Sequence, residues 1–220
     1  MPFTQTSFQF FSDLSKNNDR DWFKAHKKTF QTEVEAPFID LLEALSNRLQ
    51  DAPRPLMGGK QTTFRLNRDI RFSEDKSPYK TNMSGLLTPT GTKSMMAGIV
   101  YLHLEVGGGF TVAGYYNLSP KQLAPMRDDM IARAEKFDQV LQALEASGRT
   151  LDRSMSLSSM PKGFTEHAGH RHADVIKLKS LMVREDLPPD LWLSGDVIDH
   201  VEALARDCMP LLRFSDPARD

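Results

Sequence analysis

The sequence predicts an α+β fold, with a single domain over residues 1–220 in which a mainly antiparallel sheet packs against helices. Apolar residues recur at helical spacing towards both ends of the chain, whereas the middle alternates with the period of a strand. Two such strands are joined by Gly107-Gly108-Gly109, which predicts a central hairpin over residues 97–117. Helices precede and follow the strands instead of alternating with them, and this order is typical of α+β proteins.

Three helices are expected in the first fifty residues: an N-terminal, a second and a third helix. The first starts after Thr6 or Ser7, either of which can cap it, and the second covers residues 19–35. Pro37 disfavours helical geometry in the residue before it, so the third helix is expected to start afresh at that proline. Further along, Ser119 and Gln122 form a capping box for a middle helix that ends at Gly148.

Strands are expected at residues 62–67, 83–88 and 180–185, in addition to the two of the hairpin. Simple pairing across the hairpin puts Val106 opposite Phe110 on an apolar face that packs on helices. The other face is polar and aromatic, and is either exposed to solvent or the floor of a cleft. Its side chains are Tyr101, His103, Glu105, Thr111 and Tyr115.

The composition is that of an ordinary globular protein, with 40% apolar residues, 26% charged residues and a net charge of −1 in 220 residues. This balance argues against a nucleic-acid partner and against a membrane-surface partner, so anion binding needs a local cluster. A lone cysteine, Cys208, fits a reducing compartment and is expected to be buried. The chain has no signal-peptide pattern and no apolar stretch near ~20 residues, so we expect a cytoplasmic protein.

One segment, residues 65–82, carries most of the candidate chemistry and reads RLNRDIRFSEDKSPYKTN. It holds five basic and three acidic side chains. On an extended strand, Arg65, Asp69 and Arg71 share a face with Asn67 and Ser73, and planar guanidinium groups suit bidentate binding of phosphate or carboxylate. The expected ligand-binding residues are Arg65, Arg68, Asp69, Arg71, Ser73, Lys76, Tyr79 and Lys80.

Three roles for this segment stay open: a salt-bridge network that fixes a loop, binding of an anionic small molecule, and direct catalysis such as hydrolysis or group transfer. The weak candidates for a proton carrier are His26, His103 and Asp75. For His26 the alternative is a ring that packs beside Trp22 and hydrogen-bonds a carbonyl. A protein–protein interaction module, with the charges as a structural brace, is the alternative function.

A second cluster, His167, His170 and His172, has the spacing H-x-x-H-x-H, for which Glu166 or Asp174 could complete a zinc site. Its glycine-flanked, polar surroundings favour a loop instead, so we predict no metal and no cofactor. The glycine run of the hairpin lacks the following helix and the GK[ST] ending of a phosphate-binding loop.

Four stretches together resemble the DUF2461 family of uncharacterised proteins. They are FRLNRDIRFSEDKSPYKTN, the N-terminal pair FFSDL and NNDRDWF followed by AHK, the glycine hairpin with Gly114, and MPKGF at residues 160–164. They cover most of the chain, and their order makes the resemblance specific. It implies a shared fold and a shared site at residues 65–82, and it implies no reaction.

Overall fold

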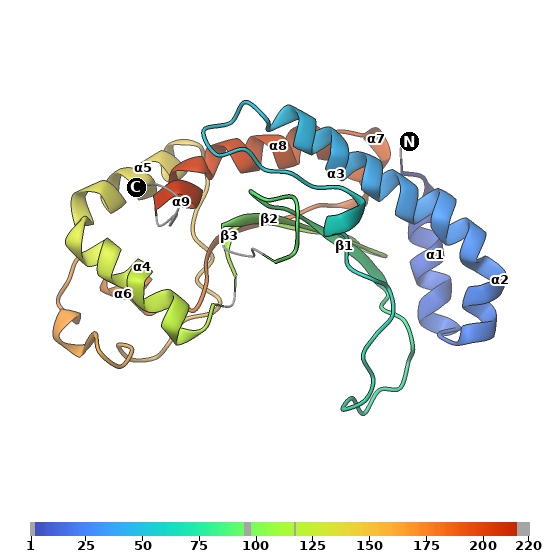
Figure 1. Ribbon diagram of the computed structural model, residues 1–220, viewed down its shortest axis with the longest axis horizontal. Coiled ribbons are helices and arrows are strands. Elements are labelled where there is room, and N and C mark those ends of the chain that lie inside the picture. The colour runs from blue at the N-terminus through green and yellow to red at the C-terminus, as the bar shows by residue number, and fades with distance from the viewer. Residues whose placement is uncertain (1–2, 95–97, 117, 215–220) are drawn as a thin grey trace. The chain divides into compact units, whose positions relative to one another are not determined.

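The computed structural model describes residues 3–94, 98–116 and 118–214 and confirms the α+β class (Figure 1). Four strands form one antiparallel sheet in the order β1-β2-β3-β4. Their bounds are β1 Asn82–Leu87, β2 Ile99–Glu105, β3 Gly108–Tyr115 and β4 Leu181–Asp186. The chain divides into two compact units, one of Met1–Met95, Val100–Thr111 and Glu185–Ala203, the other of Met96–Ile99, Val112–Arg184 and Leu204–Asp220. The expectation of a single domain stays a prediction.

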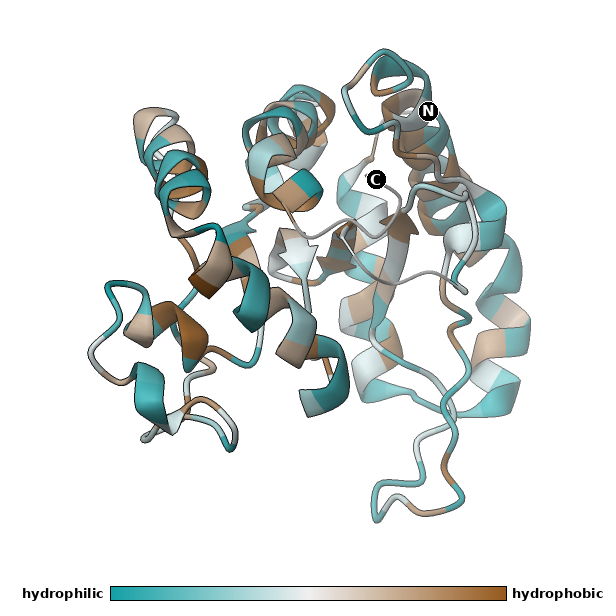
Figure 2. Ribbon diagram, turned by 60° about the vertical axis from the view of Figure 1, so that its left-hand side comes forward, coloured by the Kyte–Doolittle hydropathy of each residue, from teal (hydrophilic) through white to brown (hydrophobic). Residues whose placement is uncertain are grey.

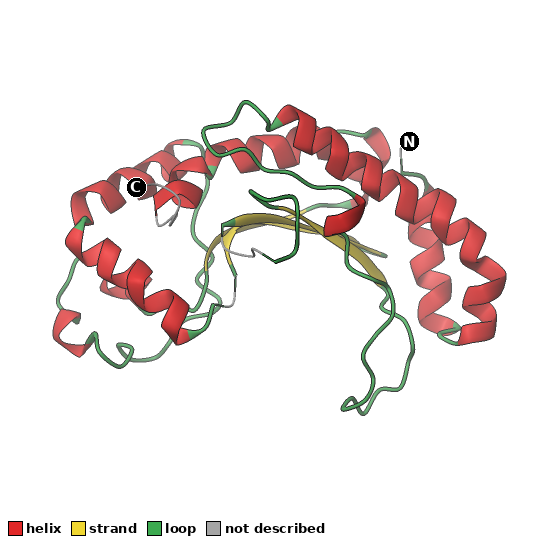
Figure 3. Ribbon diagram, in the orientation of Figure 1, coloured by secondary structure: helices red, strands yellow, loops and turns green. Residues whose placement is uncertain are grey.

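The first unit begins with α1 (Gln5–Lys16) and then a continuous helix made of α2 (Arg20–Phe30), a π-helical turn (Gln31–Glu35) and α3 (Ala36–Arg48) (Figure 3). Thr4 caps α1, so the expected caps at Thr6 and Ser7 are wrong. Asp19 caps α2, and its carboxylate accepts hydrogen bonds from two backbone N–H groups, in agreement with the expected helix start.

The predicted break at Pro37 is wrong, because Ala36 has helical torsions of −64° and −50°. A proline inside a helix frees the carbonyl four residues earlier, here that of Glu33. The π turn widens the helix just before the proline. The hydroxyl of Ser7, which is fully buried, donates to the freed Glu33 carbonyl at 2.6 Å. A contact with another helix therefore lets this helix continue through the proline.

The pairing of β1 with β2 separates an apolar face from a polar one. Leu102 and Leu104 of β2 lie opposite Gly85 and Met83, and both leucines are fully buried. A Cβ on Gly85 would lie 2.7 Å from Leu42 of α3, so this helix packs directly on the strand. On the alternate positions, the register places Tyr101 opposite Leu86, His103 opposite Ser84 and Glu105 opposite Asn82.

The expected register of the central hairpin is wrong. Its turn is Val106-Gly107, and Val106 is 55% exposed instead of packing in the core. Phe110 stacks on His103 of the polar face, with ring centroids 4.6 Å apart. Two residues expected on that face, Thr111 and Tyr115, are buried. The hairpin ends that we predicted, Ala97 and Asn117, lie outside the described residues.

A predicted strand over 62–67 is also wrong. Residues Lys60–Thr62 form a short 3-10 helix, and Thr63 and Asn67 make only isolated bridges, with Gly85 and Tyr79. The strands expected at 83–88 and 180–185 correspond to β1 and β4 to within one residue. The rest of the first unit contains α7 (Pro189–Ser194) and most of α8 (Val197–Asp207).

The second unit contains α4 (Pro120–Ala132), α5 (Ala134–Ala146), a short α6 (Ala173–Ile176) and α9 (Met209–Phe214). Ser119 and Gln122 form the predicted capping box, but the expected middle helix is interrupted at Arg133, with torsions of −118° and 43°. The Arg133 guanidinium donates to the Phe214 carbonyl at 2.9 Å and lies 4.8 Å from the Phe214 ring centroid. Cys208 is fully buried, as expected.

Apolar positions form brown stripes along otherwise teal helices, the pattern of helices that bury one face (Figure 2). Within the described residues, no helix is long and apolar enough to cross a membrane.

Candidate functional site

The charged segment forms a long projecting loop that leads into β1 (Figure 1). Its two arms pair where the Arg68 N–H donates to the Pro78 carbonyl and the Lys80 N–H donates to the Leu66 carbonyl, at 2.9 and 2.8 Å. Residues 69–77 form the tip, where the chain reverses. The predicted extended face of Arg65, Asp69 and Arg71 therefore does not continue past the arms.

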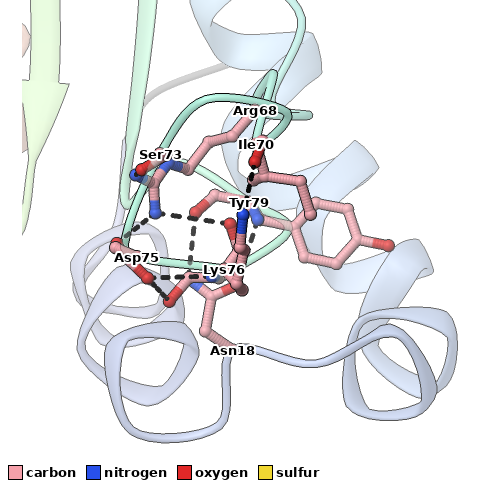
Figure 4. A network of polar contacts seen from close by, with 8 residues as sticks. Asn18, Arg68, Ile70, Ser73, Asp75, Lys76 and Tyr79 are labelled. Carbon is pink, nitrogen blue, oxygen red and sulfur yellow. Dashed lines mark hydrogen bonds and ion pairs between the residues drawn. The ribbon is translucent and has the colours of Figure 1, made fainter.

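Asn18, at the junction of α1 and α2, holds the loop in place (Figure 4). Its amide group donates to the Tyr79 carbonyl at 2.9 Å, and its side-chain oxygen accepts from the Tyr79 N–H at 3.1 Å. The Tyr79 ring stacks on Phe23 of α2, with centroids 4.2 Å apart and planes inclined by 24°. Both contacts tie the second arm to the helical hairpin, so the loop is anchored at its base.

Arg68 organises the tip from inside (Figure 4). Its guanidinium pairs with the Asp75 carboxylate and donates to the Ser77 carbonyl and the Ser73 hydroxyl, both at 3.3 Å. Asp75 also accepts from the hydroxyl and the N–H of Ser77, at 2.6 and 2.8 Å. The Ser77 bonds, followed by the bond from Arg68, lower the pKa of Asp75 from 3.8 to about 2. Asp75 is thus an anion that braces the loop.

Two further basic side chains of the tip have partners, whereas Glu74 makes no hydrogen bond or ion pair among the described residues. Arg71 binds Asp69 through two nitrogens, at 2.9 and 2.6 Å, and this contact lowers the pKa of the Asp69 carboxyl. Lys76 donates to the Ile70 carbonyl at 3.1 Å. Between these pairs Phe72 is 95% exposed. The tip is therefore a closed polar network that presents one aromatic ring.

Three further cations lie at the base of the loop: Lys80 and Lys93 lie over the Phe64 ring, and the charge of Arg65 acts on Lys80. The Lys80 and Lys93 ammonium groups lie 5.7 and 5.6 Å from the Phe64 ring centroid. Burial and then the charge of Arg65 lower the pKa of Lys80. Lys93 donates to the Thr63 carbonyl at 2.6 Å. Among the described residues, no carboxylate forms an ion pair with Arg65 or Lys80, although the charge of Arg65 also helps to lower the pKa of Asp69. The base is therefore more electropositive than the tip.

A surface pocket of about 400 Å³ opens between the loop base and the α1–α2 junction. Almost all of its lining groups are hydroxyls, amides or charged side chains. The lining residues are Ser15, Asn18, Arg68, Asp75, Ser77, Tyr79, Lys80, Thr81 and Asn82.

The pocket gathers only some of the residues predicted from the sequence. Of the expected ligand-binding residues, Arg68, Tyr79 and Lys80 line it, and so does Asp75. The others, Arg65, Asp69, Arg71, Ser73 and Lys76, do not line it. The expected ligand-binding residues did not include Ser15, Asn18, Ser77, Thr81 or Asn82, although the run of hydroxyl and amide residues at 77–82 was visible in the sequence.

The two candidate histidines of the first unit lie in different surroundings. His26 stacks on Trp22 with centroids 4.0 Å apart, and its Nδ1 lies 2.8 Å from the Trp22 carbonyl, which is the geometry of the non-catalytic alternative. His103 lies on β2 between Tyr101 and Glu105. Neither side chain lines the pocket.

The histidine cluster belongs to the second unit. His172 is buried, and its Nε2 lies 3.0 Å from an Asp138 oxygen. His170 accepts a hydrogen bond from the His172 N–H at 3.1 Å, and burial, followed by the charge of His172, lowers the pKa of His170. In the part of the chain that the structure describes, no group of three His, Cys, Asp or Glu side chains is placed to hold a metal ion.

Comparison with known proteins identifies the family. A family model described as a conserved hypothetical protein, DUF2461, matches residues 6–214. The chain belongs to the DUF2461 family. No curated protein and no solved structure matches the chain. The match confirms the resemblance that the four sequence stretches indicated, and the loop and its pocket lie inside the matched residues.

Proposed function

We propose that this DUF2461 protein binds a small anionic ligand, one that bears a phosphate or carboxylate group, in the pocket at the base of the loop. One observation carries the proposal: Lys80 is partly buried beside Arg65, and this lowers its pKa, while no carboxylate of the described residues pairs with either. Two crowded cations repel each other, and a bound anion relieves that repulsion.

Most of the remaining lining groups suit the same ligand, and the one carboxylate in the lining, Asp75, is paired with Arg68. The hydroxyl of Thr81, the Asn82 amide and the second N–H of the Asn18 amide supply neutral hydrogen-bond donors around the cations. Arg68 is already bound to Asp75, and Arg71 to Asp69, so these arginines support the shape of the loop. The proposed ligand-binding charge therefore comes from Lys80, which lines the pocket, and from Arg65, which lies outside the lining and adds its charge beside Lys80.

A thermal-shift measurement with pyrophosphate, nucleotides and sugar phosphates tests this proposal. We expect at least one of these anions to raise the melting temperature of the wild-type protein and of Lys136→Gln, an exposed lysine on α5 that serves as the control. The shift should disappear in Lys80→Gln and shrink in Arg65→Gln. Equal shifts in all four proteins, or no shift with any anion, would contradict the proposal.

A second function, a protein–protein interaction module, is favoured by Phe72. The ring is 95% exposed on a tip that Arg68, Asp75 and Asn18 hold in shape, so ordering it in a complex costs little entropy. Aromatic side chains beside an arginine are typical anchors of interfaces, and the Arg71 guanidinium lies 5.8 Å from the Phe72 ring centroid. Gel filtration of lysate complexes should then show an assembly that Phe72→Ser abolishes and Lys80→Gln leaves intact.

A further inference from the structure

Three side chains on the polar face of β2 form a hydrogen-bonded chain that the anion pocket does not use. Tyr101, His103 and Glu105 alternate along the strand and so point to the same side. The Tyr101 hydroxyl lies 3.0 Å from His103 Nδ1, and His103 Nε2 lies 3.3 Å from a Glu105 carboxylate oxygen. Residues with the spacing Tyr-x-His-x-Glu therefore form one continuous chain of hydrogen bonds.

The Glu105 carboxylate determines which atoms donate and which accept in these hydrogen bonds. An ionised Glu105 only accepts hydrogen bonds, so Nε2 of a neutral His103 carries the proton and donates it to Glu105. Nδ1 is then the acceptor, and the Tyr101 hydroxyl donates to it. A hydroxyl that donates to an imidazole, which in turn donates to a carboxylate, is the arrangement that activates a hydroxyl nucleophile.

Neighbouring rings hold the imidazole in this orientation. Phe110 of β3 stacks on His103, with centroids 4.6 Å apart and planes inclined by only 16°. Phe110 also lies beside Tyr101, at 5.8 Å between centroids. The register correction described above is what brings Phe110 to this face.

The Tyr101–His103–Glu105 hydrogen-bonded chain lies beside the cations of the loop base. The Phe64 ring, which the Lys80 and Lys93 ammonium groups contact, has its centroid 6.4 Å from that of the Tyr101 ring. At the other end, Glu105 is directly opposite Asn82, which lines the pocket. Phe64 thus contacts both Tyr101 and the cations of the loop base.

We propose that Tyr101 is a nucleophile, with His103 as its general base and Glu105 as the residue that positions His103, and that its substrate is an anionic ester. The Tyr101 oxygen bonds to the phosphorus or acyl carbon of the ester while the hydroxyl proton moves to His103 Nδ1. The bond to the leaving alcohol breaks with its electron pair on oxygen, and His103 returns the proton to that oxygen. The reaction class rests on the side-chain geometry alone, and the charge of the substrate rests on the proposed function.

Labelling with sulfonyl fluorides tests this without a known substrate. In that reaction the tyrosine oxygen bonds to sulfur, fluoride leaves, and the phenol proton goes to the base. The probes are 4-(fluorosulfonyl)benzoate, which is anionic, and uncharged benzenesulfonyl fluoride, with sites and rates read by peptide mass spectrometry. Tyr116, which is 52% exposed, is the internal control in the same chain.

We expect both probes to label Tyr101 at least about tenfold faster than Tyr116, a modest share of the 10²–10⁴ that a positioned base contributes. His103→Asn, which keeps an acceptor but removes the base, should reduce Tyr101 to the rate of Tyr116, and Glu105→Gln should give an intermediate rate. Circular dichroism checks that each variant is folded. Labelling of Tyr101 that is no faster than that of Tyr116, or that His103→Asn leaves unchanged, would overturn the proposal.

The two probes separate this inference from the proposed function. If the cations guide the substrate, the anionic probe should label Tyr101 faster than the neutral one, and Lys80→Gln combined with Lys93→Gln should remove that advantage. Fast labelling that depends on His103 but shows no preference for the anionic probe supports the nucleophile and contradicts anion binding at the loop base.

Discussion

Asn18 shows how one short side chain can set the position of a whole loop. Its side-chain amide hydrogen-bonds both the N–H and the carbonyl of Tyr79, as the backbone of a neighbouring strand would. Its place before Asp19, the cap of α2, is visible in the sequence, but its partner lies 61 residues away. No local pattern indicates such a contact.

Replacing Asn18 with alanine should lower the free energy of unfolding by about 1–3 kcal/mol, because two partly buried backbone groups lose their partners. The free energy of unfolding of Asn18→Asp should lie between those of the wild type and Asn18→Ala, because its carboxylate still accepts from the Tyr79 N–H but cannot donate to the Tyr79 carbonyl. Urea unfolding measures both. The exposed Asn67→Ala is the control, with an expected change within about 0.5 kcal/mol; an equal effect of both alanine variants would argue against the clamp.

Asp75 makes a prediction about acid stability. Its folded pKa of about 2 lies below its ordinary 3.8, so the folded state favours the ionised form. This contribution is complete above pH ~4 and is lost as the pH falls towards 2. Asp75→Asn should therefore melt below the wild type at pH 5, and the gap should close by pH 2.

The neighbouring Glu74→Gln is the matched control, because Glu74 makes no hydrogen bond or ion pair in the described residues. Its melting temperature should track that of the wild type at every pH. A gap between Asp75→Asn and the wild type that persists at pH 2 would show that the carboxylate charge is not what braces the loop.

Among elements, the glycines of β3 decide the hairpin register. Gly109 has a φ of 131°, and a Cβ there would lie 1.8 Å from the His103 carbonyl oxygen. The run Gly107-Gly108-Gly109 was expected to form the hairpin turn, yet two of its residues belong to the strand. The sequence indicates a hairpin there, whereas the choice of turn residues depends on how closely the neighbouring strands approach.

Gly109→Ala should destabilise the protein by at least about 3 kcal/mol, through both the positive φ and the overlap with β2. Gly107→Ala is the matched control, because a Cβ at Gly107 meets nothing within 4 Å. Denaturant unfolding of the two variants compares them directly. If Gly109→Ala and Gly107→Ala are equally stable, then β2 and β3 do not approach each other as closely as described, and Phe110 does not stack on His103.

Local signals predicted elements well where a few neighbouring residues decide the structure, and less well where distant ones do. The Ser119 capping box and the strands β1 and β4 were found from sequence alone. The continuation of the helix through Pro37 depends on Ser7, and the interruption at Arg133 accompanies its contacts with Phe214. The charged segment was found as a whole, but its division into a self-paired tip and an electropositive base needed the fold.

At the scale of the whole molecule, the net charge is close to zero, but the base and the tip of the loop differ in their local charge. The net charge is −1, yet Arg65, Lys80 and Lys93 lie at the loop base and form no ion pair with a carboxylate of the described residues. In the tip, by contrast, Arg68 and Arg71 each form an ion pair with an aspartate. This contrast is the basis of the account: the tip keeps the loop in shape, and the base binds the anion.

The most direct test is a titration of the ¹⁵N-labelled protein with pyrophosphate, followed amide by amide by NMR. The account predicts saturable shifts centred on Asn18, Ser77 and residues 80–82, much weaker in Lys80→Gln and unchanged in Lys136→Gln. Shifts that grow linearly, spread over basic side chains across the whole surface and persist in Lys80→Gln would contradict a binding site at the base of the loop.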